Sequence, residues 1–252
     1  MRCKIATVLF FSVILCFSSN AGNCSTSNDL LLVTNEFPPY TIIKNSDFSG
    51  ISVDIVRKLS NLAGFPGNII ILPWKRALHE TKYRNVLLFP YVRRPYREKQ
   101  FKWIGPIMTD TFVFVVNSED KRDFNTIEDF RDLEIGVVQS TPTAYRLQKM
   151  GFKKLQYVSR ERQNAFKMFY GNRIDAWYGP ELILTHTLRS EGINPYKMKI
   201  AFRDIDVEMY IAASLSVRDD IVSLWQKNLD NLKNSGQYLQ ILKKYGYEQP
   251  QP

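Results

Sequence analysis

The segment 72–107 gathers residue types that can bind a small charged molecule. Aromatic turns marked by proline stand near its two ends, at Pro73–Trp74 and Trp103–Pro106. Its cations are Lys75, Arg76, Lys82, Arg84, Arg93, Arg94, Arg97, Lys99 and Lys102, against the acids Glu80 and Glu98. An arginine guanidinium binds a carboxylate through paired hydrogen bonds and also stacks on aromatic rings. The segment is therefore a candidate anion-binding region, although a solvated basic loop beside a core would show the same composition.

A second stretch places aromatic residues where α/β sheets bind ligands. The apolar run 30–34 leads directly into Glu36-Phe37-Pro38-Pro39-Tyr40, and prolines end a strand in an extended loop. Loops at the C-terminal ends of strands line the ligand crevice of open α/β sheets. Phe37 and Tyr40 are thus candidate walls of a pocket, with packing beside the prolines as the alternative.

A third candidate is the polar turn at 139–142, between an expected strand and an expected helix. Thr141 is a good N-cap residue, and Pro142 suits the first position of a helix. Such a turn presents free backbone N–H groups that favour an anion. Ser140 and Thr141 are therefore possible ligand contacts, while an ordinary helix cap remains the simpler interpretation.

The elements that must position these residues alternate between strand and helix. Apolar runs predict strands at 30–34, 68–72, 86–89 and 111–116, and helical periodicity predicts helices at 51–62 and 74–83. This order is typical of a parallel α/β sheet. Strands and helices alternate in the second half as well, where residues 126–129 resemble a capping box that opens a short helix. Further elements are expected at 134–138, 143–150, 162–170, 174–178, 181–189, 197–202 and 210–214, and the polar residues 203–206 separate the last two strands.

The C-terminal part is expected to be helical. Ile221, Leu224, Trp225 and Leu232 share one face of a helix that Asn234-Ser235-Gly236 ends, and a second helix runs to Tyr245. We expect both helices to pack on the first half of the chain.

The first 21 residues have the pattern of a secretory signal peptide. Arg2 and Lys4 precede an apolar run at 5–17, and small residues at 19–21 suit cleavage after Ala21. The run is too short to cross a membrane, and nothing later approaches the roughly 20 residues that a span requires. We therefore expect an exported, soluble mature chain.

Cysteine usage fits export without disulfides. Cys3 and Cys16 lie in the signal peptide, which leaves Cys24 alone in the mature chain. A single thiol forms neither an internal disulfide nor a thiolate metal site. Asn23 stands where lipoprotein signals place a small residue, so a free thiol in an N-terminal tail is favoured over lipid attachment at Cys24.

The net charge of the chain indicates which kinds of partner it can bind. The formal net charge is +9, or +7 once Arg2 and Lys4 are removed with the signal peptide. Acids are spread throughout and no long Lys/Arg run occurs, so we do not expect nucleic acid as a partner. A preference for anionic ligands, or for an anionic membrane surface, is the more economical inference.

Motifs in order along the chain resemble family 3 of the bacterial extracellular solute-binding proteins, the periplasmic amino-acid-binding proteins of ABC importers. The resemblance covers roughly 28–247. A Pro73-Trp74-Lys75-Arg76-Ala77 stretch is similar to one divergent branch of that family. The other markers are Glu36-Phe37-Pro38-Pro39-Tyr40, Gly50, Asp54, Arg97-Glu98-Lys99-Gln100-Phe101, Gly105-Pro106, Gly136-Val137-Val138-Gln139-Ser140-Thr141, Asn172-Arg173-Ile174-Asp175-Ala176 and Lys244-Tyr245-Gly246.

The resemblance implies a periplasmic-binding-protein-like type II fold, with two α/β lobes joined by two hinge crossings. Lobe 1 would comprise 28–112 plus 207–252 and lobe 2 would comprise 117–202, with hinges at about 111–117 and 201–208. The lobes of such proteins close on the solute. By resemblance, Arg97 clamps the ligand carboxylate, Phe37 forms an aromatic wall, and Ser140-Thr141 contacts the same carboxylate from lobe 2.

The chain departs from the family pattern where an amino group would bind. Family members that bind amino acids carry an acid at the position of Pro180, and Glu181 stands one step later. An unpaired ammonium group is costly to bury, so either Glu181 replaces that acid or the ligand lacks an α-amino group. Trp74, Tyr91, Trp177 and Tyr178 could line a larger pocket that accepts rings or sugars, with core or interlobe packing as the alternative.

These features favour a monomeric, periplasmic binding protein that traps a small carboxylate-bearing solute, an amino acid or a related molecule, for an inner-membrane ABC permease. No cofactor or metal is expected. An extracytoplasmic sensor on the same fold is the main alternative. A dehydratase-like enzyme is disfavoured, because His79, His186, Glu181 and Asp206 show no spacing that pairs an acid with a base. The identity of the solute is left open.

Overall fold

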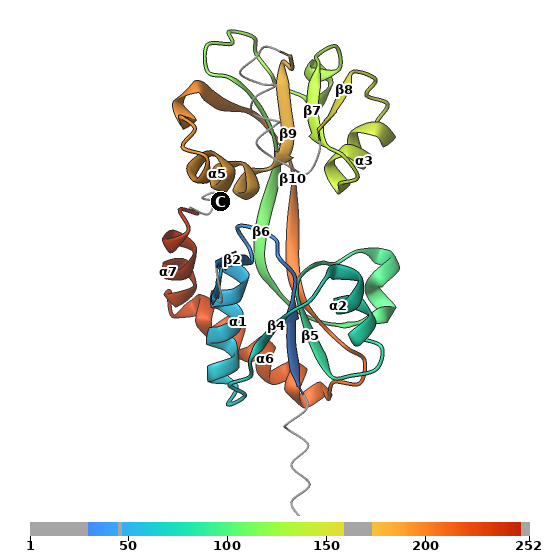
Figure 1. The fold of residues 1–252 in the computed structure, drawn as a ribbon, viewed down its shortest axis with the longest axis vertical. Helices are drawn as coiled ribbons and strands as arrows, with labels where there is room; N and C mark the ends of the chain where they lie inside the picture. Colours follow the sequence, from blue (N-terminus) through green and yellow to red (C-terminus); the bar gives the residue numbers. More distant parts are fainter. Residues whose placement is uncertain (1–29, 45–46, 159–172, 248–252) are drawn as a thin grey trace, which may run out of the picture.

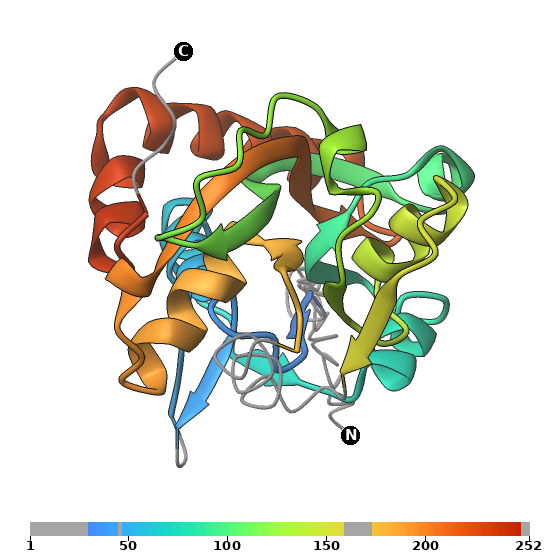
Figure 2. The same cartoon turned by 90° about the horizontal axis from the view of Figure 1, so that it is seen from above.

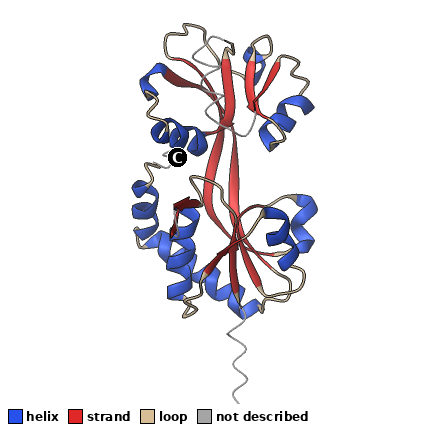
Figure 3. Cartoon of the chain, in the orientation of Figure 1, coloured by secondary structure: helices blue, strands red, loops and turns tan. Residues whose placement is uncertain are grey.

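The computed structural model describes residues 30–44, 47–158 and 173–247, and shows two α/β lobes stacked end to end (Figure 1). The expected signal peptide, Cys24 and the expected helix at 162–170 lie outside these residues. Two long strands, β6 (Lys102–Asn117) and β10 (Met198–Ala213), run through the waist from one lobe into the other (Figure 3). The mixed α/β architecture matches the fold expected from the sequence.

One sheet of eight strands extends through both lobes in the order β4-β1-β5-β10-β6-β9-β7-β8. In the first lobe, β1 (Leu31–Thr34) lies parallel to β4 (Ile69–Ile71) and β5 (Val86–Val92). In the second, β7 (Ile135–Val138) lies parallel to β8 (Leu155–Val158) and to β9 (Ala176–Pro180), which pairs with β6 in antiparallel orientation.

The first lobe buries both faces of its sheet, because successive side chains of a strand point to opposite sides. Leu32 and Leu87 face α1 (Ile51–Leu62), α6 (Asp219–Asn234) and α7 (Gln237–Lys244). Val33 and Leu88 face α2 (Trp74–Glu80). The expected packing of the C-terminal helices on this lobe is confirmed, except that Leu224 is 38% exposed and lies off the buried face of α6.

The second lobe is layered in the same way. Phe114 and Tyr178 face α3 (Pro142–Lys149), whereas Val113 and Trp177 face α5 (Glu181–Ser190). Seen from above, α3 and α5 lie on opposite sides of the lobe (Figure 2). The short elements are η1 (Pro95–Gln100), η2 (Ile127–Phe130), η3 (Pro195–Lys197) and the hairpin of β2 (Ile42–Lys44) with β3 (Asp47–Ser49).

The expected break at 203–206 is wrong. β10 is continuous, and it pairs with β6 from Met198 opposite Asn117 to Ala213 opposite Lys102. Register shifts absorb local irregularities, one of them between Arg203 and Ile205. Polar side chains here signal solvent on one face of a twisted ribbon, and the backbone hydrogen bonds continue regardless of them.

Candidate functional site

Arg97 lies against the aromatic residues of the first lobe. Its guanidinium carbon is 4.2 Å from the ring centroid of Tyr91, and its Nη1 donates to the carbonyl of Val92 at 2.8 Å. The Tyr91 ring is buried, with its centroid 5.2 Å from that of Trp74. Arg97, Tyr91 and Trp74 are therefore brought together at the end of β5, and no carboxylate of the described chain forms an ion pair with Arg97.

The two arginines before η1 differ in their partners. Arg93 forms a bidentate ion pair with Glu98 and lies over the rings of Trp103 and Tyr210. That pairing raises the pKa of the Arg93 guanidinium. Arg94 forms no ion pair with any described residue. A hollow of about 470 Å³ next to it is lined by Val92, Arg93, Arg94, Thr109, Asp206, Val207, Glu208 and Tyr210.

Phe37 and Tyr40 contact each other but differ in exposure. Their ring centroids are 4.8 Å apart. Tyr40 is fully buried, so its ring lies within the core beside Phe37 and is not an open pocket wall in this structure. Phe37 remains partly exposed at the end of β1.

The Tyr40 hydroxyl donates to Asp110, a 1% exposed residue of β6 at the waist. Asp110 Oδ1 also accepts from the backbone amides of Thr111 at 2.8 Å and Leu182 at 3.2 Å, the latter in the first turn of α5. Burial raises the pKa of Asp110 to about 6, against the lowering effect of these hydrogen bonds. Asp110 thus connects the loop after β1 with the start of α5.

Ser140 and Thr141 form the turn that was expected before α3. Ser140 is exposed and has a φ of 59°, and Thr141 Oγ1 accepts from the amide of Ala144 at 3.3 Å as the N-cap. The capping prediction is confirmed. No hydrogen bond or ion pair of the described residues joins this turn to Arg97, so the expected ligand contacts of the two lobes do not touch each other here.

Tyr178 and Glu181 already have partners on β10. The buried Tyr178 hydroxyl donates to Asp204, which also accepts two hydrogen bonds from Arg146 at 2.6 and 2.8 Å. Burial and the Asp204 carboxylate raise the pKa of Tyr178. Glu181 forms a bidentate ion pair with Arg203.

Trp177 is buried between β9 and α5, so it packs in the core of this lobe. It does not line an open pocket in this structure.

Several charged residues at the waist were not singled out from the sequence as ligand contacts. They are Asp110, Arg146, Asp204 and Glu208. Arg94 was named only among the cations of the segment 72–107, and Asp206 only as a possible base. An alternation of acids at 204, 206 and 208 within a continuous strand could have indicated one polar face. The alternation was missed because residues 203–206 were expected to be a break between two strands.

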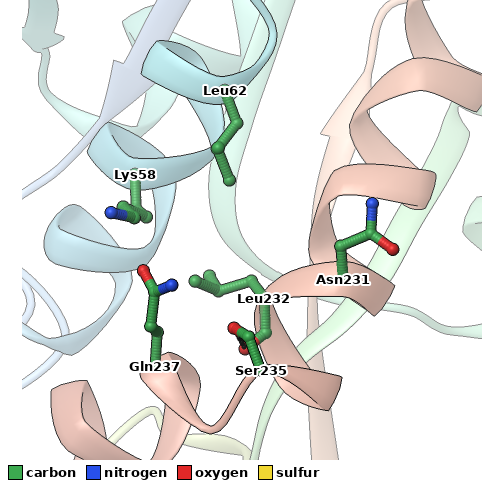
Figure 4. A pocket seen from close by; sticks show the side chains of 6 residues that line it. All are labelled: Lys58, Leu62, Asn231, Leu232, Ser235 and Gln237. Carbon is green, nitrogen blue, oxygen red and sulfur yellow. Dashed lines mark hydrogen bonds between the residues drawn. The ribbon is translucent and has the colours of Figure 1, made fainter.

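A smaller hollow of about 190 Å³ lies between α1, α6 and α7 and is lined by Lys58, Leu62, Asn231, Leu232, Ser235 and Gln237 (Figure 4). It contains none of the expected ligand contacts. Within residues 30–44, 47–158 and 173–247, no group of three or more His, Cys, Asp or Glu side chains could hold a metal ion. No helix of that part of the chain is long and apolar enough to cross a membrane.

Two α/β lobes joined by paired strands define the chain as a protein of the periplasmic-binding-protein-like type II class. The family model of the bacterial extracellular solute-binding proteins, family 3, matches residues 31–248. The chain belongs to this family, as the sequence motifs indicated. No curated protein matches.

Solved structures share the fold at low sequence identity. The second substrate-binding domain of GlnP from Lactococcus lactis, in an open conformation, is 15% identical with a TM-score of 0.67, covering 86% of this chain and 95% of that one. The arginine-, lysine-, histidine-binding protein ArtJ from Geobacillus stearothermophilus is 16% identical with a TM-score of 0.65, covering 88% and 97%. A histidine kinase sensor domain similar to periplasmic binding proteins is 16% identical with a TM-score of 0.68, covering 86% and 96%.

Proposed function

We propose that this protein is exported to the periplasm and traps a small carboxylate-bearing solute, an amino acid or a related molecule, for an inner-membrane ABC importer. The observation that carries the proposal is the arginine at the family's clamp position. Arg97 lies in η1, and its guanidinium is held by Val92 and Tyr91 at the end of β5, without an ion-pair partner among the described residues. A guanidinium oriented in this way is available to a carboxylate.

The lobes would act as a hinged trap. We assign 28–112 plus 207–252 to lobe 1 and 117–202 to lobe 2, with hinges at about 111–117 and 201–208. A solute that contacts Arg97 and Phe37 in lobe 1 and the Ser140-Thr141 turn in lobe 2 stabilises the closed arrangement, because both sets of contacts form only on closure. We propose a monomer, since a hinged trap of this kind is complete within one chain.

The proposal is tested with a thermal-shift screen of the exported chain against amino acids, dicarboxylates, amines and small sugars, followed by titration calorimetry. A solute at about 100 times its Kd stabilises the fold by about 2.7 kcal/mol. Arg97→Ala should abolish binding of any carboxylate solute, whereas Lys99→Ala on the exposed side of η1 should bind normally. If Arg97→Ala bound the solute with unchanged affinity, Arg97 would not be the residue that binds the carboxylate.

A sensor role is the second candidate, favoured by the fold shared with a histidine kinase sensor domain. The two roles differ in the membrane partner. Cross-linking of the solute-loaded protein in its native membranes should capture a permease if the protein serves an importer. Capture of a sensor kinase instead would favour the second candidate.

A further inference from the structure

The hollow at the waist carries charges of both signs. It lies where the end of β5 meets the central parts of β6 and β10, and its volume of about 470 Å³ is within the usual range for small-molecule sites. Arg94 lines it from lobe 1, and Asp206 and Glu208 line it from β10. A hollow with both signs of charge suits a solute that is itself charged at both ends.

Arg94 is the cation of this hollow that remains available. Its neighbour Arg93 is neutralised by Glu98 through a bidentate pair. Arg94 forms no ion pair with a described residue and is only partly exposed. A solute carboxylate would therefore find Arg94 free to form paired hydrogen bonds.

The two acids are oriented but not neutralised. Asp206 Oδ1 accepts from the Thr111 hydroxyl at 2.7 Å, and Glu208 Oε2 accepts from the Tyr210 hydroxyl at 2.6 Å. The second oxygen of each carboxylate has no hydrogen-bond donor in the described part of the chain. Both side chains are exposed, so water solvates them until a solute arrives.

Two cations near Asp206 and Glu208, Arg203 and Lys233, bind other partners. Arg203, near Asp206, pairs with Glu181, and Lys233, near Glu208, donates to the carbonyl of Pro106 at 2.7 Å. Neither forms an ion pair with Asp206 or Glu208. Glu181, which the sequence offered as one possible replacement for the family acid, is paired with Arg203.

We propose that this hollow determines the specificity of the solute site, with Arg94 as a second guanidinium on the carboxylate that Arg97 clamps, and Asp206 and Glu208 binding two cationic groups. The solute class is then a basic amino acid or a similar carboxylate with two positive groups. This inference rests on the proposed solute-binding function. A neutral amino acid would leave one acid without a partner when the lobes close over it, and an acidic one would be repelled.

The test is titration calorimetry of the full exported chain with matched solutes. L-lysine, L-arginine and L-ornithine should bind, and L-leucine, L-glutamine and L-glutamate should bind at least about tenfold more weakly. Cadaverine is lysine without its carboxylate, so it lacks the group that Arg94 and Arg97 are proposed to bind. Cadaverine should bind weakly, and Arg94→Gln should lower the affinity for lysine much more than the affinity for cadaverine.

Asp206→Asn and Glu208→Gln keep the size of each side chain, and each should lower the affinity for lysine by about tenfold or more. The control is Asp123→Asn, an exposed acid outside the hollow, which should leave affinity unchanged. Thermal melting of each variant without solute shows whether it is folded.

The outcomes separate this inference from the proposed function. Tight binding of neutral amino acids that is insensitive to Asp206→Asn and Glu208→Gln would overturn the inference and leave the solute-binding function standing. Lysine binding that is lost in Arg97→Ala or Glu181→Gln but retained in the three hollow variants would overturn it as well, by placing the site elsewhere. No binding of any solute class would overturn both.

Discussion

Single residues at the waist show how burial and partners set the state of a charge. Asp110 and Asp206 lie on the neighbouring strands β6 and β10, yet Asp110 is 1% exposed and Asp206 is open to solvent. The hydroxyl of Tyr40 and two backbone amides compensate Asp110 only in part, and burial raises its pKa to about 6 from an ordinary value of 3.8. The folded protein therefore disfavours the ionised form of this one carboxyl.

This shift predicts a pH dependence of stability. Between about pH 4 and pH 6, Asp110 is protonated in the folded chain and ionised in the unfolded chain, so folding takes up a proton. The contribution of Asp110 to stability is thus largest below pH 4 and falls as the pH rises through about 6, by about 2–3 kcal/mol.

The measurement compares urea unfolding of the wild type and Asp110→Asn from pH 4 to pH 7. The stability of the wild type relative to the variant should decline over this interval and level off above pH 6. Asp123→Asn, which removes an exposed carboxyl, serves as the control and should track the wild type. Parallel pH profiles for wild type and Asp110→Asn would contradict the raised pKa.

At the scale of elements, several motif residues of the family meet at the start of α1. Gly50 is its N-cap, and its amide donates to the Tyr245 hydroxyl at 2.9 Å. Asp54, in the first turn, accepts from Tyr245 at 2.8 Å and from Lys244 at 2.6 Å. These contacts fix α7 against α1. The start of α1 lies against the loop of Phe37, so the marker residues Gly50, Asp54, Lys244 and Tyr245 help to position that loop.

Gly50→Ala should disturb that frame strongly. Gly50 has a φ of 125°, and an added Cβ would lie 2.3 Å from the backbone oxygen of Tyr40. Backbone cannot yield as a flexible side chain does, so we expect a loss of about 2 kcal/mol or more in unfolding free energy. Solute affinity should fall as well, because the loop of Phe37 must move.

Gly64→Ala is the matched control. Gly64 also has a positive φ, 71°, but an added Cβ would meet nothing within 4 Å. It should cost only the backbone strain of about 1–2 kcal/mol and leave solute affinity unchanged. Equal effects of the two substitutions on affinity would show that the contact between Gly50 and Tyr40 does not position the loop.

At the scale of the whole molecule, the two lobes are connected by side-chain hydrogen bonds as well as by the two long strands. Arg189 at the end of α5 donates to the carbonyl of Tyr245 at 3.1 Å, and the Tyr247 hydroxyl donates to the carbonyl of Thr109 at 2.7 Å. The C-terminal segment after α7 therefore touches both the second lobe and the waist. Any change in the angle between the lobes must rearrange these contacts.

The proposed trap predicts compaction on binding. With a saturating solute, the radius of gyration from small-angle X-ray scattering should decrease, because closure brings the Ser140-Thr141 turn towards Arg97. Arg97→Ala at the same solute concentration should keep the radius of the free protein. A bound solute without any compaction would show that the lobes do not close on it.

The motifs and the periodicity of the sequence were sufficient for the fold class and the family. Strands at 30–34 and 86–89 and helices at 51–62 and 181–189 were predicted within a few residues, because their apolar residues recur with the period of the element that buries them. The N-cap at Thr141 followed from local chemistry alone. The length of β10 did not, since its hydrogen bonds depend on β6, which lies some 90 residues away in the sequence.

Sequence by itself determined which residue types stand near the ends of the strands, including Arg97 and the aromatic residues Phe37 and Tyr91. Only the tertiary structure decided which of these are engaged and which are free. Tyr40 is hydrogen-bonded to Asp110, Tyr178 is hydrogen-bonded to Asp204, and Glu181 is paired with Arg203. Arg94, Asp206 and Glu208 line the hollow at the waist and form no ion pair with a described residue. The reason is physical: the free energy of a charge depends on its burial and its partners, and those come from elements distant in the chain.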